Sequence, residues 1–130
     1  MARQVVSTPA APSDPSFGQA VVAGNLVFVA GTVGMDTKTG SYPEGLAAQA
    51  EQALKNIEAV LAEAGCTLDD VVKTTSFVVP GLPREEYRGV VGAFERAFSD
   101  PPPARSAPRV AGFGPKDVLI SIEAIAVKPS

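Results

Sequence analysis

The fold is decided by the segment LAAQAEQALKNIEAVLAEA, which spans residues 46–64. Its apolar side chains recur at intervals of three and four residues, so they share one stripe along a helix. They are Leu46, Ala50, Ala53, Leu54, Ile57, Val60, Leu61 and Ala64. Gln49 and the charged residues lie largely elsewhere. Gly65 suits the position after a helix, and Ser41 with Glu44 has the spacing of a capping box, so the segment predicts a long helix with one buried face.

A strand and a second helix follow on the C-terminal side. Residues 71–79 are rich in β-branched side chains, which predicts a strand. Residues 84–98 predict a helix, which three consecutive prolines bring to an end. Gly89 and Gly92 weaken this helix by roughly 1 kcal/mol each relative to Ala, but they also permit close packing against a sheet.

The other apolar runs predict further strands and complete the fold class. They span residues 19–23, 26–30, 104–110 and 118–127. Gly24-Asn25 joins the first two as a hairpin, and Gly31 ends the second. The order ββ, α, β, α, ββ predicts an α+β fold in one domain, residues 1–130, with two helices on one face of a mixed sheet of five or six strands. The other face of the sheet needs cover, and other subunits are the expected cover.

The composition excludes several kinds of chemistry. The 130 residues include no His, no Trp and one Cys. A Ser-His-Asp or Cys-His catalytic unit is impossible without the His, and a Cys and His zinc site is excluded as well. A single Cys forms no intrachain disulfide, so nothing suggests an oxidising compartment. Catalysis must therefore use carboxylates, Arg, Lys, hydroxyl groups, the backbone or bound water.

Charge and hydropathy narrow the expected partners. The net charge is −3 and the isoelectric point about 4.9, without the basic excess that is typical of a nucleic-acid binder. The first 18 residues are polar and Pro-rich, and no apolar run approaches the length of a membrane span, so we expect a soluble cytoplasmic protein. The mean hydropathy of +0.15 is high for a small monomer, which is consistent with a surface buried between subunits or with a well-filled core.

Two charged residues stand out as candidates for chemistry. Arg105 follows a stiff run of prolines, and a stiffly held guanidinium suits a planar carboxylate, although a surface salt bridge is the commoner role. Glu123 lies in an apolar strand, where it is either solvated or ion-paired, or partly buried with a raised pKa. Arg109 and Lys116 would add positive charge near Arg105, but solvated surface positions are the commoner case. Cys66 has no cationic helper and is expected to be inert.

The C-terminal third carries a recognisable pattern. PARS at residues 103–106 is followed by ISIEAIAV at 120–127, with PKDV at 115–118 between them. Two shorter motifs precede them in the chain, VAG at 29–31 and VKTT at 72–75. Together these motifs resemble the Rid/YjgF family of reactive intermediate deaminases, also called the endoribonuclease L-PSP family. The resemblance implies a chorismate-mutase-like α+β fold and a homotrimer with a cleft at each subunit interface. It also implies hydrolysis of 2-imino acids and their enamine tautomers to 2-keto acids and ammonia, without a metal or cofactor.

The resemblance also implies roles for particular residues. Arg105 would clamp the substrate carboxylate, and Glu123 would help to hold the attacking water. Gly31 and the backbone carbonyl of Ala107 would line the cleft. An imine carbon is already electrophilic, so a positioned water and a carboxylate suffice for this reaction without His.

Several positions depart from the family pattern. Phe17 stands where deaminating members usually have Tyr, Ala30 where Ser is common, and Val91 where a polar Asn is found. Ala107 replaces a frequent Cys, and Pro108 replaces an aliphatic strand residue. These changes predict a more apolar pocket around substrate-binding residues Phe17, Gly31, Val91, Arg105 and Ala107. Such a pocket would favour larger or more hydrophobic imino acids, or would have lost efficient deamination.

The sequence leaves three functions open. The first is an imine deaminase that uses Arg105 and Glu123. The second is a non-catalytic trimer that binds small carboxylates as a sensor or an interaction module. Ribonuclease activity, attributed to relatives, is the least attractive, because the chain is acidic and lacks His. No nucleic-acid or membrane partner is expected.

Overall fold

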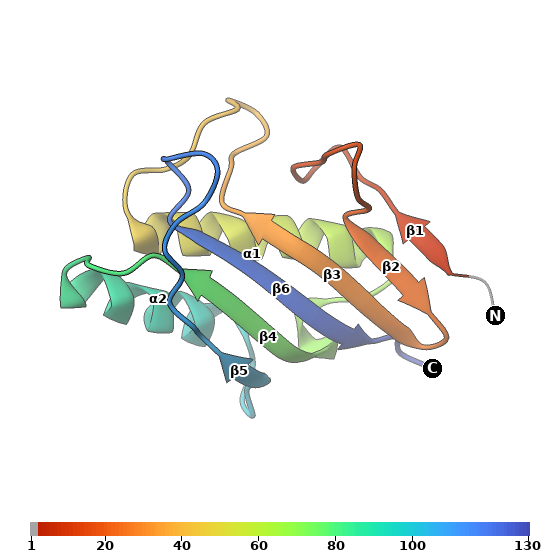
Figure 1. Ribbon diagram of the computed structural model, residues 1–130. Helices are drawn as coiled ribbons and strands as arrows, with labels where there is room; N and C mark the ends of the chain where they lie inside the picture. The colour runs from red at the N-terminus through yellow and green to blue at the C-terminus, as the bar shows by residue number, and fades with distance from the viewer. Residues whose placement is uncertain (1–2) are drawn as a thin grey trace.

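A computed structural model describes residues 3–130, which form one twisted sheet with two helices on the same face (Figure 1). The strand order is β1-β2-β3-β6-β4-β5, and every pair is antiparallel except β4 with β5. The elements are β1 Gln4–Val6, β2 Ala20–Ala23, β3 Leu26–Val33, α1 Leu46–Glu63, a short 3-10 helix Leu68–Asp70, β4 Val71–Val78, α2 Arg84–Ala97, β5 Ala104–Ser106 and β6 Ile120–Val127. The predicted α+β class, the mixed sheet and the two helices on one face are confirmed.

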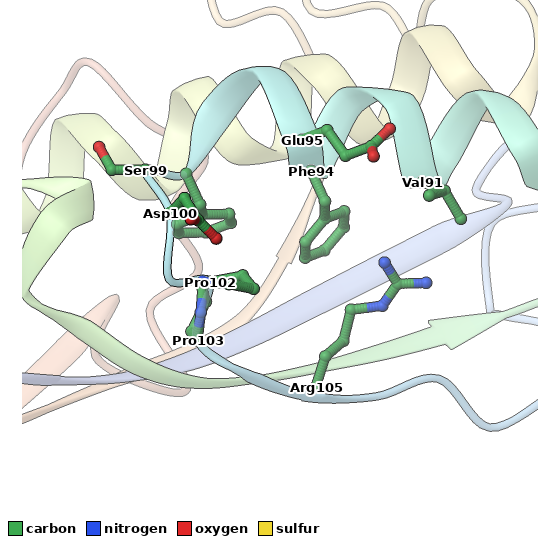
Figure 2. Close-up of a pocket in the computed structure, with 9 residues that line it drawn as sticks. Val91, Phe94, Glu95, Ser99, Asp100, Pro102, Pro103 and Arg105 are labelled. Carbon is green, nitrogen blue, oxygen red and sulfur yellow. The ribbon is translucent and has the colours of Figure 1, made fainter.

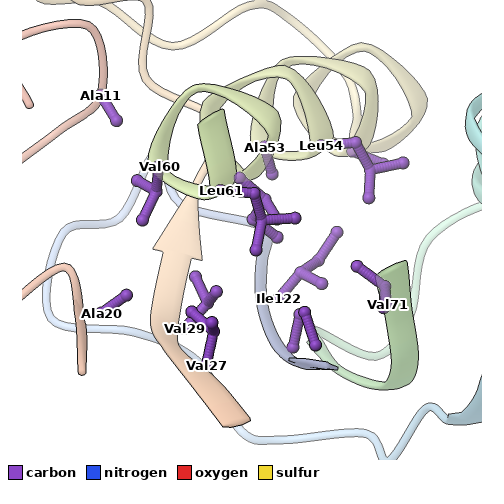
Figure 3. Packing of buried hydrophobic residues seen from close by; sticks show 14 of the residues in the cluster. Ala11, Ala20, Val27, Val29, Ala53, Leu54, Val60, Leu61, Val71 and Ile122 are labelled. Atoms are coloured by element: carbon purple, nitrogen blue, oxygen red, sulfur yellow. The ribbon is translucent and has the colours of Figure 1, made fainter. Parts of the chain in front are cut away.

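The core fills the layer between the helices and the sheet (Figure 3). In β6 every second residue faces this layer, and Ile120, Ile122, Ala124 and Ala126 are buried while their neighbours are not. The apolar stripe predicted for α1 is buried along its whole length. Helical and strand periodicities therefore converge on one core, as the sequence predicts.

The strands differ from the predicted ones mainly in three places. β3 does not end at Gly31 but continues to Val33. A bulge between Val29 and Thr32 shifts the register with β6, so pairing resumes beyond Gly31. β1 was not predicted at all, since three residues in a Pro-rich segment carry almost no periodic signal, and it pairs with β2. The segment 104–110 is extended beside β4, but only Ala104–Ser106 forms a regular strand.

The capping box predicted for the start of α1 is wrong. The residue before the helix is Gly45, with φ of 94°, and no side chain of its own segment caps the helix. Ser41 is instead tied into a turn, where its carbonyl accepts from the N–H of Asp36. The N–H of Leu46 donates to the carboxylate of Glu86 on α2 over 2.7 Å, which places a negative charge at the positive end of the helix. One helix therefore caps the other, across 40 positions of sequence.

Gln49 was predicted to lie off the buried stripe, and this is wrong. Its side chain is 2% exposed, and its amide donates to the carbonyls of Pro43 and Asp117. Its carbonyl accepts from the N–H of Leu119. A buried amide that satisfies three backbone groups joins the loop before α1 to the start of the last strand.

Asn56, also on α1, likewise satisfies buried backbone groups, here at the end of β3. Its amide donates to the carbonyls of Val33 and Met35, each over 2.9 Å. We expect Asn56→Leu to lower the free energy of unfolding by about 1–3 kcal/mol, because it leaves two carbonyls without a donor in the interior. Urea denaturation measures this loss. Gln52→Leu is the control, since Gln52 is only half-buried and bonds only to Asn56; a loss as large as that of Asn56→Leu would contradict the role of the two carbonyls.

Gly89 permits close packing against the other helix, not against the sheet as its sequence context suggested. A Cβ at Gly89 would lie 2.5 Å from the Cβ of Ala47 on α1. We expect Gly89→Ala to destabilise the fold by about 1–2 kcal/mol, because the crowding outweighs the gain in helix propensity. The double variant Ala47→Gly, Gly89→Ala moves the methyl group across the contact and should regain most of this loss in urea denaturation. Equal losses in the single and double variants would contradict the contact.

Two hydroxyl groups in β4 are buried without a partner among residues 3–130. They belong to Thr74 and Ser76, both 0% exposed on the helix-facing side of the strand. Thr74→Val keeps the shape of the side chain and removes the unpaired hydroxyl, so we expect the free energy of unfolding to rise by about 0.5–1.5 kcal/mol. Thermal and urea denaturation measure the change. A marked destabilisation would show that the hydroxyl has a partner.

Candidate active site

Arg105 lies on the edge strand β5 and turns towards the helices. Its register partner is Thr74 of β4, whose side chain is buried on the helix side of the sheet. The guanidinium carbon of Arg105 lies 4.7 Å from the centre of the Phe94 ring on α2 (Figure 2). The prolines before β5 bring the chain under the end of α2, and Arg105 follows Pro103 by two residues.

A cavity of about 540 Å³ opens beside the guanidinium. Its lining residues are Val91, Phe94, Glu95, Phe98, Ser99, Asp100, Pro102, Pro103 and Arg105. The rings of Phe94 and Phe98 lie 5.7 Å apart between centres, one helical turn from each other. We call this space the Arg105 cavity.

Arg105 forms no salt bridge with any residue between 3 and 130. The ion pair found in that part of the chain joins Arg96 to Glu51 over 3.7 Å on the exposed side of the helices. The surface salt bridge considered for Arg105 is therefore not formed within these residues. A guanidinium that is stacked on an aromatic ring, and that forms no salt bridge with the Glu95 and Asp100 of the same lining, keeps its donors available for an anion.

Arg109 occupies a separate place. Its guanidinium carbon lies 4.0 Å from the centre of the Tyr87 ring, whose hydroxyl donates to the carbonyl of Val79 over 2.7 Å. Neither Arg109 nor Lys116 lines the Arg105 cavity. The added positive charge that the sequence suggested around Arg105 is not part of its lining.

Glu123 lies on the opposite face of the sheet from Arg105. It is paired with Thr75, the neighbour of Thr74, and consecutive strand residues point to opposite faces. Glu123 is exposed on the face that no helix covers, in a hollow of about 150 Å³ that Lys73 and Thr75 also line. Of the two positions considered for Glu123, the solvent face is the observed one. Within one chain, Glu123 and Arg105 share no cavity.

The other predicted residues fall into two groups. Val91 lines the Arg105 cavity and is 43% exposed. Gly31 belongs to the bulge of β3 that lies across from Glu123 on the neighbouring strand β6. Phe17 is 53% exposed in the loop before β2, in a third hollow, and Ala107 follows β5 half-buried. Neither Phe17 nor Ala107 lines the Arg105 cavity of its own chain.

Sequence reasoning missed most of the cavity wall. Phe94 and Phe98 have the four-residue spacing of a core stripe. Phe94 does belong to the core and Phe98 packs against it, but the same two rings also line the cavity, which the spacing does not indicate. The sequence predicts a helix end and a stiff approach to Arg105 at Pro102 and Pro103, but not a cavity wall. An arginine a few residues after a helix that ends in aromatics was the signal available for this pocket.

Cys66 is buried, as its expected inertness requires. It is 3% exposed, and burial followed by the charge of Asp70 raises the pKa of its thiol. Residues 3–130 contain no cluster of three Cys, Asp or Glu side chains arranged to hold a metal ion. The same residues include no helix of the length and apolar character needed to cross a bilayer.

Fold and pocket together define a small α+β protein with an unpaired arginine beside an apolar cavity. The chain belongs to the Endoribonuclease L-PSP family, whose model matches residues 8–128.

Named relatives extend this assignment. A RutC family protein of Haemophilus influenzae is 40% identical over 98% of this chain and 99% of its own. A rat protein named 2-iminobutanoate/2-iminopropanoate deaminase is 39% identical over 97% of this chain and 90% of its own. Among solved structures, RidA from an Antarctic Psychrobacter superposes with a TM-score of 0.86 at 36% identity and covers 95% of this chain and 98% of its own. The predicted family is confirmed, and a hydrolytic deaminase role is supported.

Proposed function

We propose that this protein hydrolyses 2-imino acids to 2-keto acids and ammonia, with Arg105 as the clamp for the substrate carboxylate. The observation that carries the proposal is the unpaired guanidinium of Arg105, held 4.7 Å from the Phe94 ring at the mouth of a cavity. A relative named for imine deamination, 39% identical to this chain, supports the same reaction.

The reaction needs little beyond positioning. Water adds through its oxygen to the imine carbon, and one of its protons passes to the imine nitrogen. The carbon–nitrogen bond of the resulting amino alcohol then breaks, the hydroxyl proton leaves with ammonia, and the carbonyl forms. A carboxylate that accepts the water proton and returns it to nitrogen balances both steps. Arg105 holds the substrate by its carboxylate and fixes the imine carbon in place for attack.

We propose a homotrimer in which the cleft lies between subunits. Both helices lie on one face of the sheet and leave the other face uncovered (Figure 1). The uncovered face carries Phe28, 43% exposed, and Glu123, and it needs a second layer. Arg105 and Glu123 share no cavity in one chain, so the proposed water-holding role of Glu123 requires the guanidinium of a neighbouring copy. Phe17, Gly31 and Ala107 are proposed to line the cleft in the same arrangement.

Subunit mixing tests the shared cleft. Arg105→Ala and Glu123→Gln are each expected to lose most imine hydrolysis alone. After they are unfolded and refolded together in equal amounts, random trimers should regain about a quarter of wild-type activity, because that share of interfaces joins one intact Arg105 to one intact Glu123. No recovery would exclude the shared pair. Full activity of Glu123→Gln alone would mean that a group other than Glu123 holds the attacking water. It would not contradict the role of Arg105 in binding the substrate carboxylate.

One observation favours a second function, carboxylate binding without turnover. The walls of the Arg105 cavity are largely apolar, and Glu123, the carboxylate proposed to hold the attacking water, does not line it. Calorimetry with 2-keto acids, combined with an assay for imine loss, separates the two functions. Binding without any rate above buffer would establish the binding role, and Arg105-dependent turnover would establish the deaminase.

A further inference from the structure

We propose that the Arg105 cavity selects 2-imino acids with a large apolar side chain, such as those derived from leucine, methionine or phenylalanine, over those derived from alanine and 2-aminobutyrate. This inference rests on the proposed function and specifies its substrate class. The side chain of the substrate would occupy the wall formed by Val91, Phe94 and Phe98, while Arg105 holds the carboxylate.

The size of the cavity is the first argument. Its volume of about 540 Å³ falls within the range of roughly 300–1,000 Å³ that is usual for pockets of drug-sized ligands. An imino acid with a methyl side chain would fill only a small part of it and leave the apolar wall in contact with water. A branched or aromatic side chain would displace that water and bury the wall.

The placement of the wall relative to the guanidinium is the second argument. Arg105 stacks over Phe94 (Figure 2). The ring of Phe98, the residue directly after α2, lies 5.7 Å from that of Phe94. Pro102 and Pro103 belong to the same lining from the segment before β5. A ligand whose carboxylate bonds to Arg105 therefore has apolar surface within reach of the substituent on its adjacent carbon.

The charges around the cavity supply the third argument. The acidic residues of the lining, Glu95 and Asp100, are both exposed and form no salt bridge with Arg105. They repel a second carboxylate, so an imino acid derived from glutamate is disfavoured although its first carboxylate fits Arg105. Size and charge together point to an apolar side chain and exclude an acidic one.

Turnover of a substrate series tests the selection. An amino-acid oxidase generates each imino acid in place, and the rate of its loss yields kcat/KM. We expect the leucine-derived substrate to exceed the alanine-derived one by at least tenfold, since a methylene in an apolar pocket contributes roughly 10- to 200-fold. Calorimetry should show the same order for 4-methyl-2-oxopentanoate over pyruvate. The glutamate-derived substrate should be the poorest.

The outcomes separate this inference from the proposed function. Turnover that favours the alanine-derived substrate, or treats both alike, would overturn the selection and leave the deaminase standing. No turnover of any substrate would overturn the deaminase, and the order of the keto-acid affinities would then decide the selection alone. No binding of any keto acid would overturn both.

A matched pair of variants assigns the selection to this wall. Val91→Asn should lower the ratio of kcat/KM for the leucine-derived over the alanine-derived substrate by roughly tenfold, because it places an amide on the wall. Val72→Asn is the control, since Val72 is similarly exposed, at 48% against 43% for Val91, and lies outside the cavity. An unchanged ratio in Val91→Asn, or an equal change in both variants, would contradict the role of the wall.

Discussion

Arg105→Ala is expected to lower kcat/KM for imine hydrolysis by roughly 100- to 1,000-fold, which corresponds to about 3–4 kcal/mol of lost transition-state stabilisation. The guanidinium is the charged donor proposed for the substrate carboxylate, and among residues 3–130 no other cation lines its cavity. Removing it leaves a carboxylate against the apolar surface of Phe94, without a charged partner. Arg105→Lys should recover only part of the rate, because an ammonium does not bond to both oxygens of a carboxylate as a guanidinium does.

The control for this variant is Arg109→Ala. Arg109 is also exposed and also stacked on an aromatic ring, 4.0 Å from the centre of Tyr87, but it lies outside the Arg105 cavity. We expect it to retain nearly all imine hydrolysis. Thermal unfolding should show that both alanine variants are folded, since both arginines lie on the surface. An equal loss of activity in the two variants would attribute the effect to surface charge and not to a clamp.

The position of Arg105 was predictable, but its surroundings were not. The consecutive prolines before it indicate a stiff approach, and the structure places its guanidinium firmly against α2. The spacing of Phe94 and Phe98 is the same for a core stripe and for a cavity wall. A core stripe and a cavity wall differ in which segment packs against the two rings. Here it is the segment before β5, and tertiary structure, not local spacing, brings it there.

The fold shows the same division between local and long-range signals. The apolar stripe of α1 was predictable because it depends on spacing within one segment. The burial of Gln49 was not, because its partner Asp117 lies 68 positions away. The cap of α1 by Glu86 is 40 positions away, so a local capping rule selected Ser41 and Glu44 wrongly. Periodicity describes faces of elements, and it carries no information about which loops fold over them.

The separation of Glu123 from Arg105 has the same origin. A sequence motif places both residues in one family signature, but strand alternation sends Glu123 to the uncovered face and Arg105 to the helix side. Whether they cooperate depends on a second copy of the chain, and the mixing experiment addresses that point directly.

Gly34→Ala is expected to destabilise the fold by about 3–5 kcal/mol, more than any other substitution considered above. A Cβ at Gly34 would lie 2.2 Å from the backbone carbonyl oxygen of Gln49 and 2.9 Å from its Cα and carbonyl carbon. Backbone atoms cannot rotate away as a side chain would. The amide of Asn56 also holds the carbonyls of Val33 and Met35 against α1, so the strand end cannot move off the helix without breaking two hydrogen bonds.

Gly112→Ala isolates the steric cause of this effect. Gly112 has open space around its position, and neither Gly34 nor Gly112 has a positive φ, so both tolerate an alanine backbone. We expect Gly112→Ala to stay within about 0.5 kcal/mol of the wild type in urea denaturation, as surface substitutions usually do. If Gly34→Ala is too unstable to purify, its soluble yield beside that of Gly112→Ala, expressed in parallel, provides the comparison. Wild-type stability or yield for Gly34→Ala would mean that the end of β3 can move away from α1. It would contradict the tight contact between Gly34 and the backbone of Gln49.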